Sequence, residues 1–295
     1  MENNVIPESE LVLNEDGSVY HLKLKPENVA SNVILVGDPG RVQQVAAFFD
    51  SIDFSTANRE FVTVTGFYQG TRFTVISTGI GTDNIDIVMN ELDATVNIDL
   101  ESRSPYQQRK SLNIVRIGTS GGLHPDLAVD SFVLSYYGLG FDGLIYYYKH
   151  KLTDDELIIN SKLNKHLNWD TNLATPYIVA ADEHLLNILG DGMQQGITAT
   201  ATGFYGPQGR KLTLALQNPQ MHDQLRSFEY QGLRITNFEM ETSALYGLGK
   251  LMGHRCCTVC AIIANRVTKQ YSQDYHLVID RLISTVLQRI SKHDG

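Results

Sequence analysis

The stretch that predicts the fold reads Asn113-Ile114-Val115-Arg116-Ile117-Gly118-Thr119-Ser120-Gly121-Gly122. Its apolar run from Ile114 to Ile117, bounded by glycines, predicts a buried β-strand. Because an unpaired buried charge is costly, Arg116 must meet an anion there, either a carboxylate or a ligand. The glycines that follow allow the backbone to approach a ligand closely, and successive N–H groups can form an anion-binding concavity. Two interpretations stay open at this point: a phosphate cradle, or a tight turn whose arginine pairs with an acidic side chain.

The composition favours a globular protein with a substantial core and no affinity for nucleic acid. The chain has 295 residues, a formal net charge of -9 and 42% hydrophobic residues. An acidic chain without a basic stripe is not typical of nucleic-acid binders. Residues Met1 to Glu10 are polar and acidic, and no apolar run approaches the roughly 20 residues that span a bilayer. We therefore expect a soluble, cytoplasmic protein without a membrane partner.

The three cysteines cluster as Cys256-Cys257-Thr258-Val259-Cys260. Cys257 and Cys260 have the spacing of a metal or redox pair, but no second pair of ligands accompanies them. Their run is apolar and strand-like, so we expect buried cysteines that pack as small hydrophobic side chains. The sequence predicts neither a disulfide nor a metal site here.

Apolar runs that alternate with helical periodicity predict an α/β fold. Strands are expected at residues 32–36, 61–68, 72–77, 114–117, 132–136, 176–181, 197–201, 234–238 and 254–264. Helices are expected after Pro39 and at residues 84–96, 154–167, 244–251 and 274–292. The weakly alternating segment Tyr20 to Leu24 is expected on the surface or on a partner. No repeat or linker divides the chain, so we expect one domain over residues 1–295, with an N-terminal extension at 1–19 and a loop insertion at 97–111.

Two glycine-containing turns follow predicted strands. Gly37-Asp38-Pro39-Gly40-Arg41 ends one strand and starts a helix, where backbone N–H groups can hold an anion. A cation such as Arg41 is unfavourable in a first helical turn, and an anionic ligand would compensate it. The second turn, Gly79-Ile80-Gly81, lacks the third glycine of a dinucleotide fingerprint, and the chain contains no Walker loop.

Three polar motifs stand where loops or strand ends place ligand contacts. The loop at residues 203–210 contains Gln208, which donates and accepts hydrogen bonds, and Arg210, which only donates, so both could contact one flat polar ligand. The two carboxylates of Glu239-Met240-Glu241 stand at a strand-to-helix switch and could hold sugar hydroxyls. Asn265-Arg266 ends the last predicted strand, and open α/β sheets place ligands at the carboxyl ends of strands.

The order of these motifs is more specific than any one of them. From about Tyr20 to the final helix, the chain resembles the nucleoside phosphorylase I family, and more narrowly its uridine phosphorylase branch. The motifs that carry the resemblance are Gly37-Asp38-Pro39-Gly40-Arg41, Arg59-Glu60-Phe61, Ser77-Thr78-Gly79-Ile80-Gly81, Arg116-Ile117-Gly118-Thr119-Ser120-Gly121, Phe204-Tyr205 with Gln208 and Arg210, Glu239-Met240-Glu241, and Asn265-Arg266. The pair Gln208 and Arg210 and the Asn265-Arg266 ending are the pieces specific to the uridine branch.

The resemblance implies a fold, a reaction and an assembly. The fold would be a single α/β domain with a twisted mixed central sheet, partly closed as a barrel and flanked by helices. The reaction would be reversible phosphorolysis of uridine to uracil and ribose 1-phosphate, a pentosyl transfer of pyrimidine nucleoside salvage and catabolism. Inorganic phosphate would be the co-substrate, without an organic cofactor, in a homodimer or a hexamer built from dimers. Some members hold a monovalent cation at the dimer interface, and Glu60 matches an acidic residue there.

The resemblance also implies a role for each motif residue. Phosphate would be bound by Gly37, Arg41, Arg116 and Thr119, and by Arg59 of a neighbouring subunit. Ribose would be held by Glu239, Met240 and Glu241, with His21 of the neighbour. The base would contact Phe204, Gln208, Arg210 and Ile263, supported by Arg266. Catalysis is expected to depend on Arg41, Arg116, Gln208, Arg210 and Glu241.

Two other functions compete with this interpretation. Purine nucleoside phosphorylases and nucleosidases of the same family usually carry an aspartate where this chain reads Ala264-Asn265-Arg266. A non-catalytic nucleoside-binding protein would be favoured if the arginines of the phosphate site were missing, but all of them are present: Arg41, Arg59 and Arg116.

Overall fold

Strand β1 (Asn32–Val36) is buried along its whole length, as its apolar sequence predicts. Val33 and Leu35 pack into one hydrophobic core, whereas Ile34 and Val36 pack into another. Because successive strand residues point to opposite faces of a sheet, this strand lies between two apolar layers. A sheet covered by helices on both faces follows from that arrangement.

The computed structural model describes residues 5–293 of the chain. Its other strands are β2 (Ser51–Asn58), β3 (Phe61–Tyr68), β4 (Thr71–Ser77), β5 (Ile98–Asp99), β6 (Ser104–Pro105), β7 (Asn113–Gly122), β8 (Phe132–Gly140), β9 (Tyr177–Ala180), β10 (Gln194–Thr200), β11 (Glu229–Tyr230), β12 (Leu233–Glu239) and β13 (Arg255–Asn265). Its α-helices are α1 (Pro39–Ala46), α2 (Thr82–Asn97), α3 (Asp154–Leu167), α4 (Glu183–Leu189), α5 (Met221–Arg226), α6 (Thr242–Met252) and α7 (Tyr275–Ser291). Short 3-10 helices occupy Pro26–Asn28 (η1), Leu144–Tyr147 (η2) and Gly206–Gln208 (η3).

The strands form an 11-stranded mixed sheet, part of which closes on itself. Strand β7 pairs with β13, β13 with β8, β8 with β10, β10 with β12, and β12 again with β7. This closed circuit is the barrel-like half of the fold. The open half runs from β1 through β4 and β3 to β2. The expected single α/β domain with a partly closed mixed sheet is therefore confirmed.

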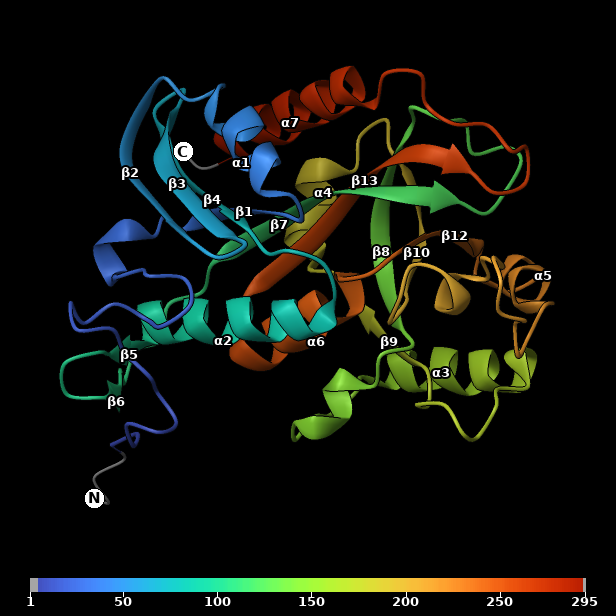
Figure 1. The fold of residues 1–295 in the computed structure, drawn as a ribbon, viewed down its shortest axis with the longest axis horizontal. Helices are drawn as coiled ribbons and strands as arrows, with labels where there is room; N and C mark the ends of the chain where they lie inside the picture. The colour runs from blue at the N-terminus through green and yellow to red at the C-terminus, as the bar shows by residue number, and fades with distance from the viewer. Residues whose placement is uncertain (1–4, 294–295) are drawn as a thin grey trace.

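Helices cover both faces of this sheet (Figure 1). Helices α1, α4 and α7 share one core, to which Val45 and Leu282 belong. Helices α2 and α6 share the core on the other face, to which Met89 and Leu245 belong. A third core joins α3 and α5 to the barrel strands and contains Leu163. The ends of β7, β12 and β13 lie between these layers, and they carry the candidate site.

The central strand is longer than the sequence predicts, which corrects the interpretation of its glycines. Strand β7 continues to Gly122, so the stretch from Gly118 to Gly122 is the end of a strand and not a tight turn. Its last two residues pair with β12 on one side and with β13 on the other. Because neighbouring strands satisfy the backbone groups there, the glycines do not end the strand.

The structure adds detail to two other local expectations. The segment from Tyr20 to Leu24 lies at the surface with Tyr20 and Lys23 exposed, while Leu22 and Leu24 are fully buried in the core that α2 shares with α6. The insertion at 97–111 contains the small two-stranded sheet β5–β6, whose strands are two residues each. Asn97 fixes both ends of this insertion through hydrogen bonds to the backbone of Lys110 at 2.6 and 3.1 Å. Of the N-terminal extension, residues 1–4 lie outside the described residues.

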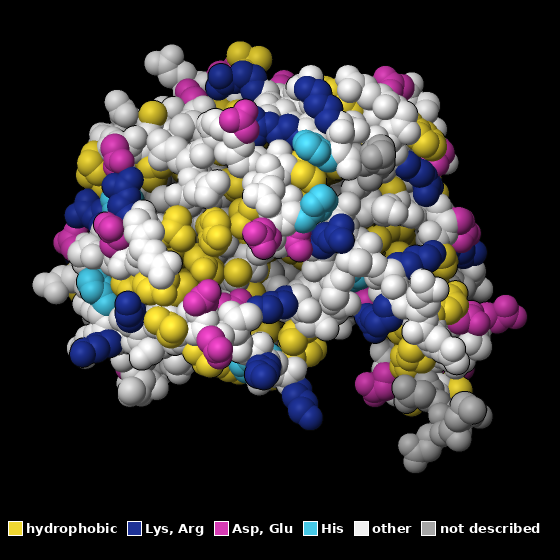
Figure 2. All heavy atoms as spheres, turned by 180° about the vertical axis from the view of Figure 1, so that it is seen from behind, with side chains coloured by type: hydrophobic (Ala, Val, Ile, Leu, Met, Phe, Trp, Pro, Cys, Tyr) yellow, Lys and Arg dark blue, Asp and Glu magenta, His cyan; other side chains and the backbone are white. Residues whose placement is uncertain are grey.

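The surface carries charges of both signs. On the face shown in Figure 2, Lys and Arg side chains are interspersed with Asp and Glu side chains and form no continuous basic field. Within residues 5–293, no helix has the length and apolar character to cross a membrane. The three cysteines are buried and form no disulfide, as their apolar strand predicts.

Candidate active site

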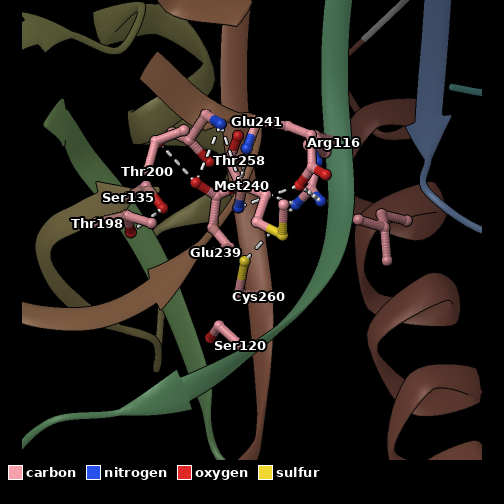
Figure 3. Close-up of polar contacts among 12 residues, drawn as sticks. Arg116, Ser120, Ser135, Thr198, Thr200, Glu239, Met240, Glu241, Thr258 and Cys260 are labelled. Carbon is pink, nitrogen blue, oxygen red and sulfur yellow. Dashed lines mark hydrogen bonds and ion pairs between the residues drawn. The ribbon is translucent and has the colours of Figure 1, made fainter. Parts of the chain in front are cut away.

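Arg116 lies buried on β7 and meets two carboxylates from β12 and the start of α6 (Figure 3). Its Nη2 donates to Oε2 of Glu241, and its Nη1 lies 3.4 Å from Oε2 of Glu239. None of these three side chains is more than 5% exposed, so their charges interact in a medium of low polarity. The prediction that Arg116 must meet an anion is confirmed, and in this structure the anions are carboxylates.

Gly118 leaves the space that the guanidinium of Arg116 occupies. A Cβ atom at position 118 would lie 2.1 Å from Nη1 of Arg116 and 3.1 Å from Sγ of Cys260. The arginine therefore folds back over its own strand, with Sγ of Cys260 4.0 Å from Nη1. Burial raises the pKa of the Cys260 thiol to about 12, so the sulfur next to the arginine is neutral.

Backbone and hydroxyl donors hold the two glutamates in place. Glu239 accepts the Thr200 hydroxyl at 2.7 Å and two backbone N–H groups at the start of α6 at 2.9 Å. Glu241 accepts the backbone N–H of Gly81 at 2.8 Å, so the second glycine turn meets a carboxylate of this chain. Burial raises the pKa of Glu241; Arg116 opposes that rise and Glu239 adds to it.

Arg41 is a second buried cation beside this cluster. It lies in the first turn of α1, where Asp38 caps the helix by accepting the N–H of Gly40. Its Nη1 lies 3.4 Å from the carbonyl oxygen of Ile117, and its buried Nε has no hydrogen-bond partner among the described residues. Burial lowers the pKa of Arg41, and the charge of Arg116 lowers it further. Two adjacent buried guanidinium groups with a free N–H donor are suited to binding an anion.

Three other predicted residues border the same region. A Cβ atom on Gly37, just after β1, would lie 3.4 Å from the carbonyl oxygen of Gly79. Thr119 is half-buried on β7 and pairs with Ala261 of β13. Met240 is half-buried between the two glutamates. The structure thus gathers the ends of β1, β7 and β12 around one group of charges.

Gln208, at the end of η3, is the centre of a second polar cluster. Its Oε1 accepts Nη1 of Arg210 at 2.7 Å and Nη2 of Arg266 at 2.8 Å. Since arginine only donates, the atom that faces both guanidinium groups is the amide oxygen. Gln208 is only 3% exposed, although the loop around it lies at the surface. The structure therefore brings all three predicted base-binding polar residues together.

Of the two remaining predicted base residues, Phe204 contacts this cluster and Ile263 packs elsewhere. Phe204 is half-exposed, and the guanidinium carbon of Arg210 lies 3.6 Å from the centre of its ring. Ile263 is half-buried on β13 and packs against the core of α1, α4 and α7. Burial lowers the pKa of Arg266 to about 10, and the charge of Arg210 contributes to that shift. Two guanidinium groups that share one acceptor oxygen have spare N–H donors, which can bind a ligand that carries hydrogen-bond acceptors.

The two clusters lie along the same strand, β7. The N–H of Arg266 donates to the carbonyl of Gly122 at 2.9 Å. A Cβ atom on Gly121 would lie 2.9 Å from Nε of Arg266, so the glycine gives the guanidinium its room. The arginine that bonds Gln208 therefore stands beside the strand that carries Arg116. Arg266 directly follows the carboxyl end of β13, which runs parallel to β7, and α/β sheets bind ligands at such ends.

Three predicted residues do not join these clusters within one chain. Arg59 is exposed on the turn between β2 and β3, and its side chain forms no ion pair among the described residues. His21 pairs with Glu91 of α2 through Nδ1 at 2.6 Å. Glu60 is half-buried and accepts the amide of Asn84 at 3.4 Å. Within the described residues, no group of three or more His, Cys, Asp or Glu side chains could hold a metal ion.

A cavity of about 970 Å³ lies on the outer side of the Gln208 loop. It is lined by Trp169 and Phe141, whose rings stack at 4.8 Å, and by the exposed side chains of Leu212 and Leu214. Arg210 borders both this cavity and the Gln208 cluster, whereas Arg116 and the two glutamates do not line the cavity. Arg210 is therefore the one residue of the two clusters that lines this cavity.

Sequence reasoning misses the groups that hold the site residues in place. The N–H of Gly81 and the hydroxyl of Thr200 fix the glutamates. His222 on α5 lies with Nε2 2.7 Å from the carbonyl oxygen of Gln208. Each acts across a contact between separate segments. Gly81 stands in a motif that the sequence reveals but that predicts no role for it, and Thr200 and His222 stand in no motif.

A model of the phosphorylase superfamily matches residues 32–291, and the chain belongs to this superfamily. Uridine phosphorylase from Thermococcus kodakarensis is 29% identical over 265 residues, which cover 88% of this chain and 82% of that protein. Uridine phosphorylase from Escherichia coli is 26% identical over 254 residues, 85% of this chain and 88% of that protein. A DeoD-type purine nucleoside phosphorylase from Listeria monocytogenes is 23% identical over 244 residues, 82% of this chain and 85% of that protein.

Solved structures agree with this family. A nucleoside phosphorylase from Trypanosoma brucei, described as showing uridine phosphorylase activity, superposes with a TM-score of 0.87. It is 29% identical, and the match covers 96% of this chain and 99% of that chain. A purine nucleoside phosphorylase from Toxoplasma gondii superposes with a TM-score of 0.61 at 20% identity, over 94% of this chain and 96% of that one, which shows a shared fold.

Proposed function

We propose that this protein catalyses the reversible phosphorolysis of uridine to uracil and ribose 1-phosphate. The observation that supports this most is that two polar clusters, one around Arg116 and one around Gln208, lie along the same strand β7. Arg116 stands on this strand, and Arg266, which bonds Gln208, donates its N–H to Gly122 at the end of the strand. The first combines cations with carboxylates and is suited to phosphate and a polyol. The second presents donors to a flat ring that carries carbonyl groups. The uridine phosphorylases among the relatives support the choice of base.

For the phosphate we propose the residues around the two buried arginines, namely Gly37, Arg41, Arg116 and Thr119. The nucleophile arrives as an anion, so no side chain has to deprotonate it. The protein has to gather positive charge and hydrogen-bond donors around the phosphate oxygens. The free Nε of Arg41 is a donor that phosphate can take up.

For the ribose we propose Glu239, Met240 and Glu241. Cleavage of the glycosidic bond develops positive charge on the sugar, as in glycoside hydrolysis. The buried carboxylate of Glu241 can stabilise that charge and accept ribose hydroxyls. Because the same carboxylate pairs with Arg116, the nucleophile and the sugar would be held side by side, which lowers the entropic part of the barrier.

For the base we propose Gln208, Arg210 and Arg266, bordered by Phe204 and Ile263. The leaving uracil develops negative charge on its ring oxygens. Donors aimed at that charge stabilise the transition state more than the ground state, and the loss of one donor typically costs about 3 kcal/mol. The three polar side chains already form one hydrogen-bonded unit, so they need little rearrangement to act together.

We further propose that a second copy of the chain completes the phosphate site. The cluster contains two buried arginines, Arg41 and Arg116, and two buried glutamates, Glu239 and Glu241, so its formal charges cancel. A phosphate dianion added to a neutral buried cluster would carry uncompensated charge. Arg59 is exposed and without an ion pair among the described residues, so a neighbouring copy could supply it as the missing cation.

Several expectations from the sequence stay predictions. His21 of the neighbouring copy is expected to close over the ribose. Glu60 is the candidate contact for a monovalent cation, and no organic cofactor is expected. The choice between a dimer and a hexamer of dimers, and the cytoplasmic location, likewise stay predictions.

Dependence on phosphate tests the proposed function. The loss of uridine absorbance is followed with and without inorganic phosphate, beside thymidine and inosine. We expect uracil release only with phosphate, and ribose 1-phosphate as the sugar product. Free ribose that forms at the same rate without phosphate would make the protein a hydrolase. Cleavage of inosine in preference to uridine would favour the purine alternative.

A further inference from the structure

His222 contacts the Gln208 loop from outside the proposed site. It lies on α5, half-buried, with Nε2 2.7 Å from the carbonyl oxygen of Gln208. The same carbonyl oxygen accepts Nη1 of Arg266 at 3.1 Å. A carbonyl oxygen has two lone pairs, so these two donors satisfy it completely. The peptide that carries the proposed base-reading amide is therefore fixed from two sides.

The tautomer of His222 follows from these contacts. A carbonyl oxygen only accepts, so Nε2 of His222 must carry the proton. Burial lowers the pKa of His222; the Gln208 carbonyl opposes this, and Arg266, Arg226 and Lys269 lower it further. Asp223 on the same helix pairs with Arg226 and balances one of these cations. At neutral pH the ring is therefore a neutral imidazole with its proton directed at the loop.

Gly209 gives an independent reason to assign this contact a role. Its φ is +68°, in the left-handed region that favours glycine. A Cβ atom on Gly209 would lie 2.6 Å from Nε2 of His222. The residue directly after Gln208 thus has no side chain where the imidazole approaches.

We infer that His222 is a positioning residue that sets the orientation of Gln208 and thereby the affinity for the base. This inference rests on the proposed function. His222 touches no part of the proposed phosphate or ribose clusters, so its effect is confined to the nucleoside. It acts through a backbone carbonyl and contacts no substrate itself.

Steady-state kinetics of substituted proteins test this inference. His222→Ala removes one neutral hydrogen bond, so we expect the KM for uridine to rise roughly 3- to 10-fold while the KM for phosphate stays unchanged. His222→Gln can place an amide N–H near the position of Nε2, and we expect it to restore most of the uridine affinity. An unchanged KM for uridine in His222→Ala, or an equal rise for both substrates, would overturn the inference.

Two further measurements keep the inference testable if His222→Ala does not fold. Gly209→Ala pushes the ring away and also strains the loop backbone at its φ of +68°, so we expect at least the same rise of the uridine KM; an unchanged value argues against the contact. Nitrogen-15 NMR of the imidazole reports the tautomer without any turnover, and a proton on Nδ1 in place of Nε2 would contradict it. Since this readout needs no activity, failure of the inference and failure of the proposed function can be told apart.

Discussion

Substitution of Gly118 by alanine should disable the proposed phosphate site around Arg116 without unfolding the protein. The φ angle of Gly118 is not in the left-handed region, so alanine costs no backbone strain there. Its Cβ atom would lie 2.1 Å from Nη1 of Arg116 and 3.0 Å from Cζ. The guanidinium would have to retreat by about 1.3 Å to reach an ordinary contact of 3.4 Å.

That displacement is large compared with the tolerance of a hydrogen bond. Nη1 of Arg116 already lies 3.4 Å from Glu239, and Nη2 bonds Glu241. Loss of one hydrogen bond to a charged group costs about 1.5–3 kcal/mol. If Arg116 binds phosphate in the transition state, kcat/KM for phosphate should fall by roughly 10- to 150-fold, because each 1.4 kcal/mol is a factor of about ten.

Initial rates at varied phosphate and fixed uridine measure this effect. Gly206→Ala is the matched control, because its Cβ atom meets nothing within 4 Å and its φ is not positive. We expect the control to keep the wild-type kcat/KM for phosphate and both variants to keep a cooperative melting transition. A Gly118→Ala protein with a wild-type kcat/KM for phosphate would refute the placement of Arg116 in the phosphate site.

Three further results are expected. Burial raises the pKa of Glu156, but hydrogen bonds from Lys250 and two backbone N–H groups outweigh it and hold that pKa below the ordinary 4.5. The stability from this carboxylate is therefore present above about pH 4.5 and lost as the pH falls through its lowered folded pKa; Tm should fall less on acidification in Glu156→Gln than in the wild type, and parallel curves would contradict this. Arg59→Ala and Arg116→Ala should each be nearly inactive, whereas heterodimers of the two should recover activity; verified heterodimers without activity would argue against a shared site. Gln208→Ala should lower kcat/KM for uridine far more than the affinity for phosphate, and cytidine cleaved as fast as uridine would show that this loop does not select the base.

The elements that the sequence predicts well are those with a complete local signal. Helix α3 (Asp154–Leu167) has the predicted bounds, and the capping box of Thr153 and Glu156 explains its start. Strand β2 (Ser51–Asn58) is missing from the predictions because none of its residues is buried, so it lacks an apolar run. Helix α5 is short and polar, and tertiary packing of Leu225 holds it in place. Local patterns therefore predict buried elements and miss those that depend on neighbours.

The candidate site likewise contains residues that the sequence predicts and residues that it misses. A buried arginine demands an anion wherever it occurs, so Arg116 can be singled out from the sequence. The identity of its partner cannot be predicted from the sequence. Glu241 is 125 positions away, and only the order of the strands in the sheet brings the two residues together. The contact of His222 with a backbone carbonyl leaves no sequence signal at all, since any residue at position 208 would present that carbonyl.

The hydrogen bonds around Gln208 suggest how the proposed base site would choose a base. Oε1 of Gln208 has two lone pairs, and Arg210 and Arg266 occupy both. The N3–H of uracil needs an acceptor, so one arginine would have to leave Oε1 when uracil enters. The released guanidinium N–H can then turn to a uracil carbonyl, and each bond lost is replaced by a bond to the base. Cytosine has no N3–H to occupy Oε1, and its exocyclic amine would face a released arginine as donor against donor. A buried donor left unpaired costs about 1–3 kcal/mol. This exchange of hydrogen-bond partners, and not the mere presence of cations, would therefore make uridine bind more favourably than cytidine.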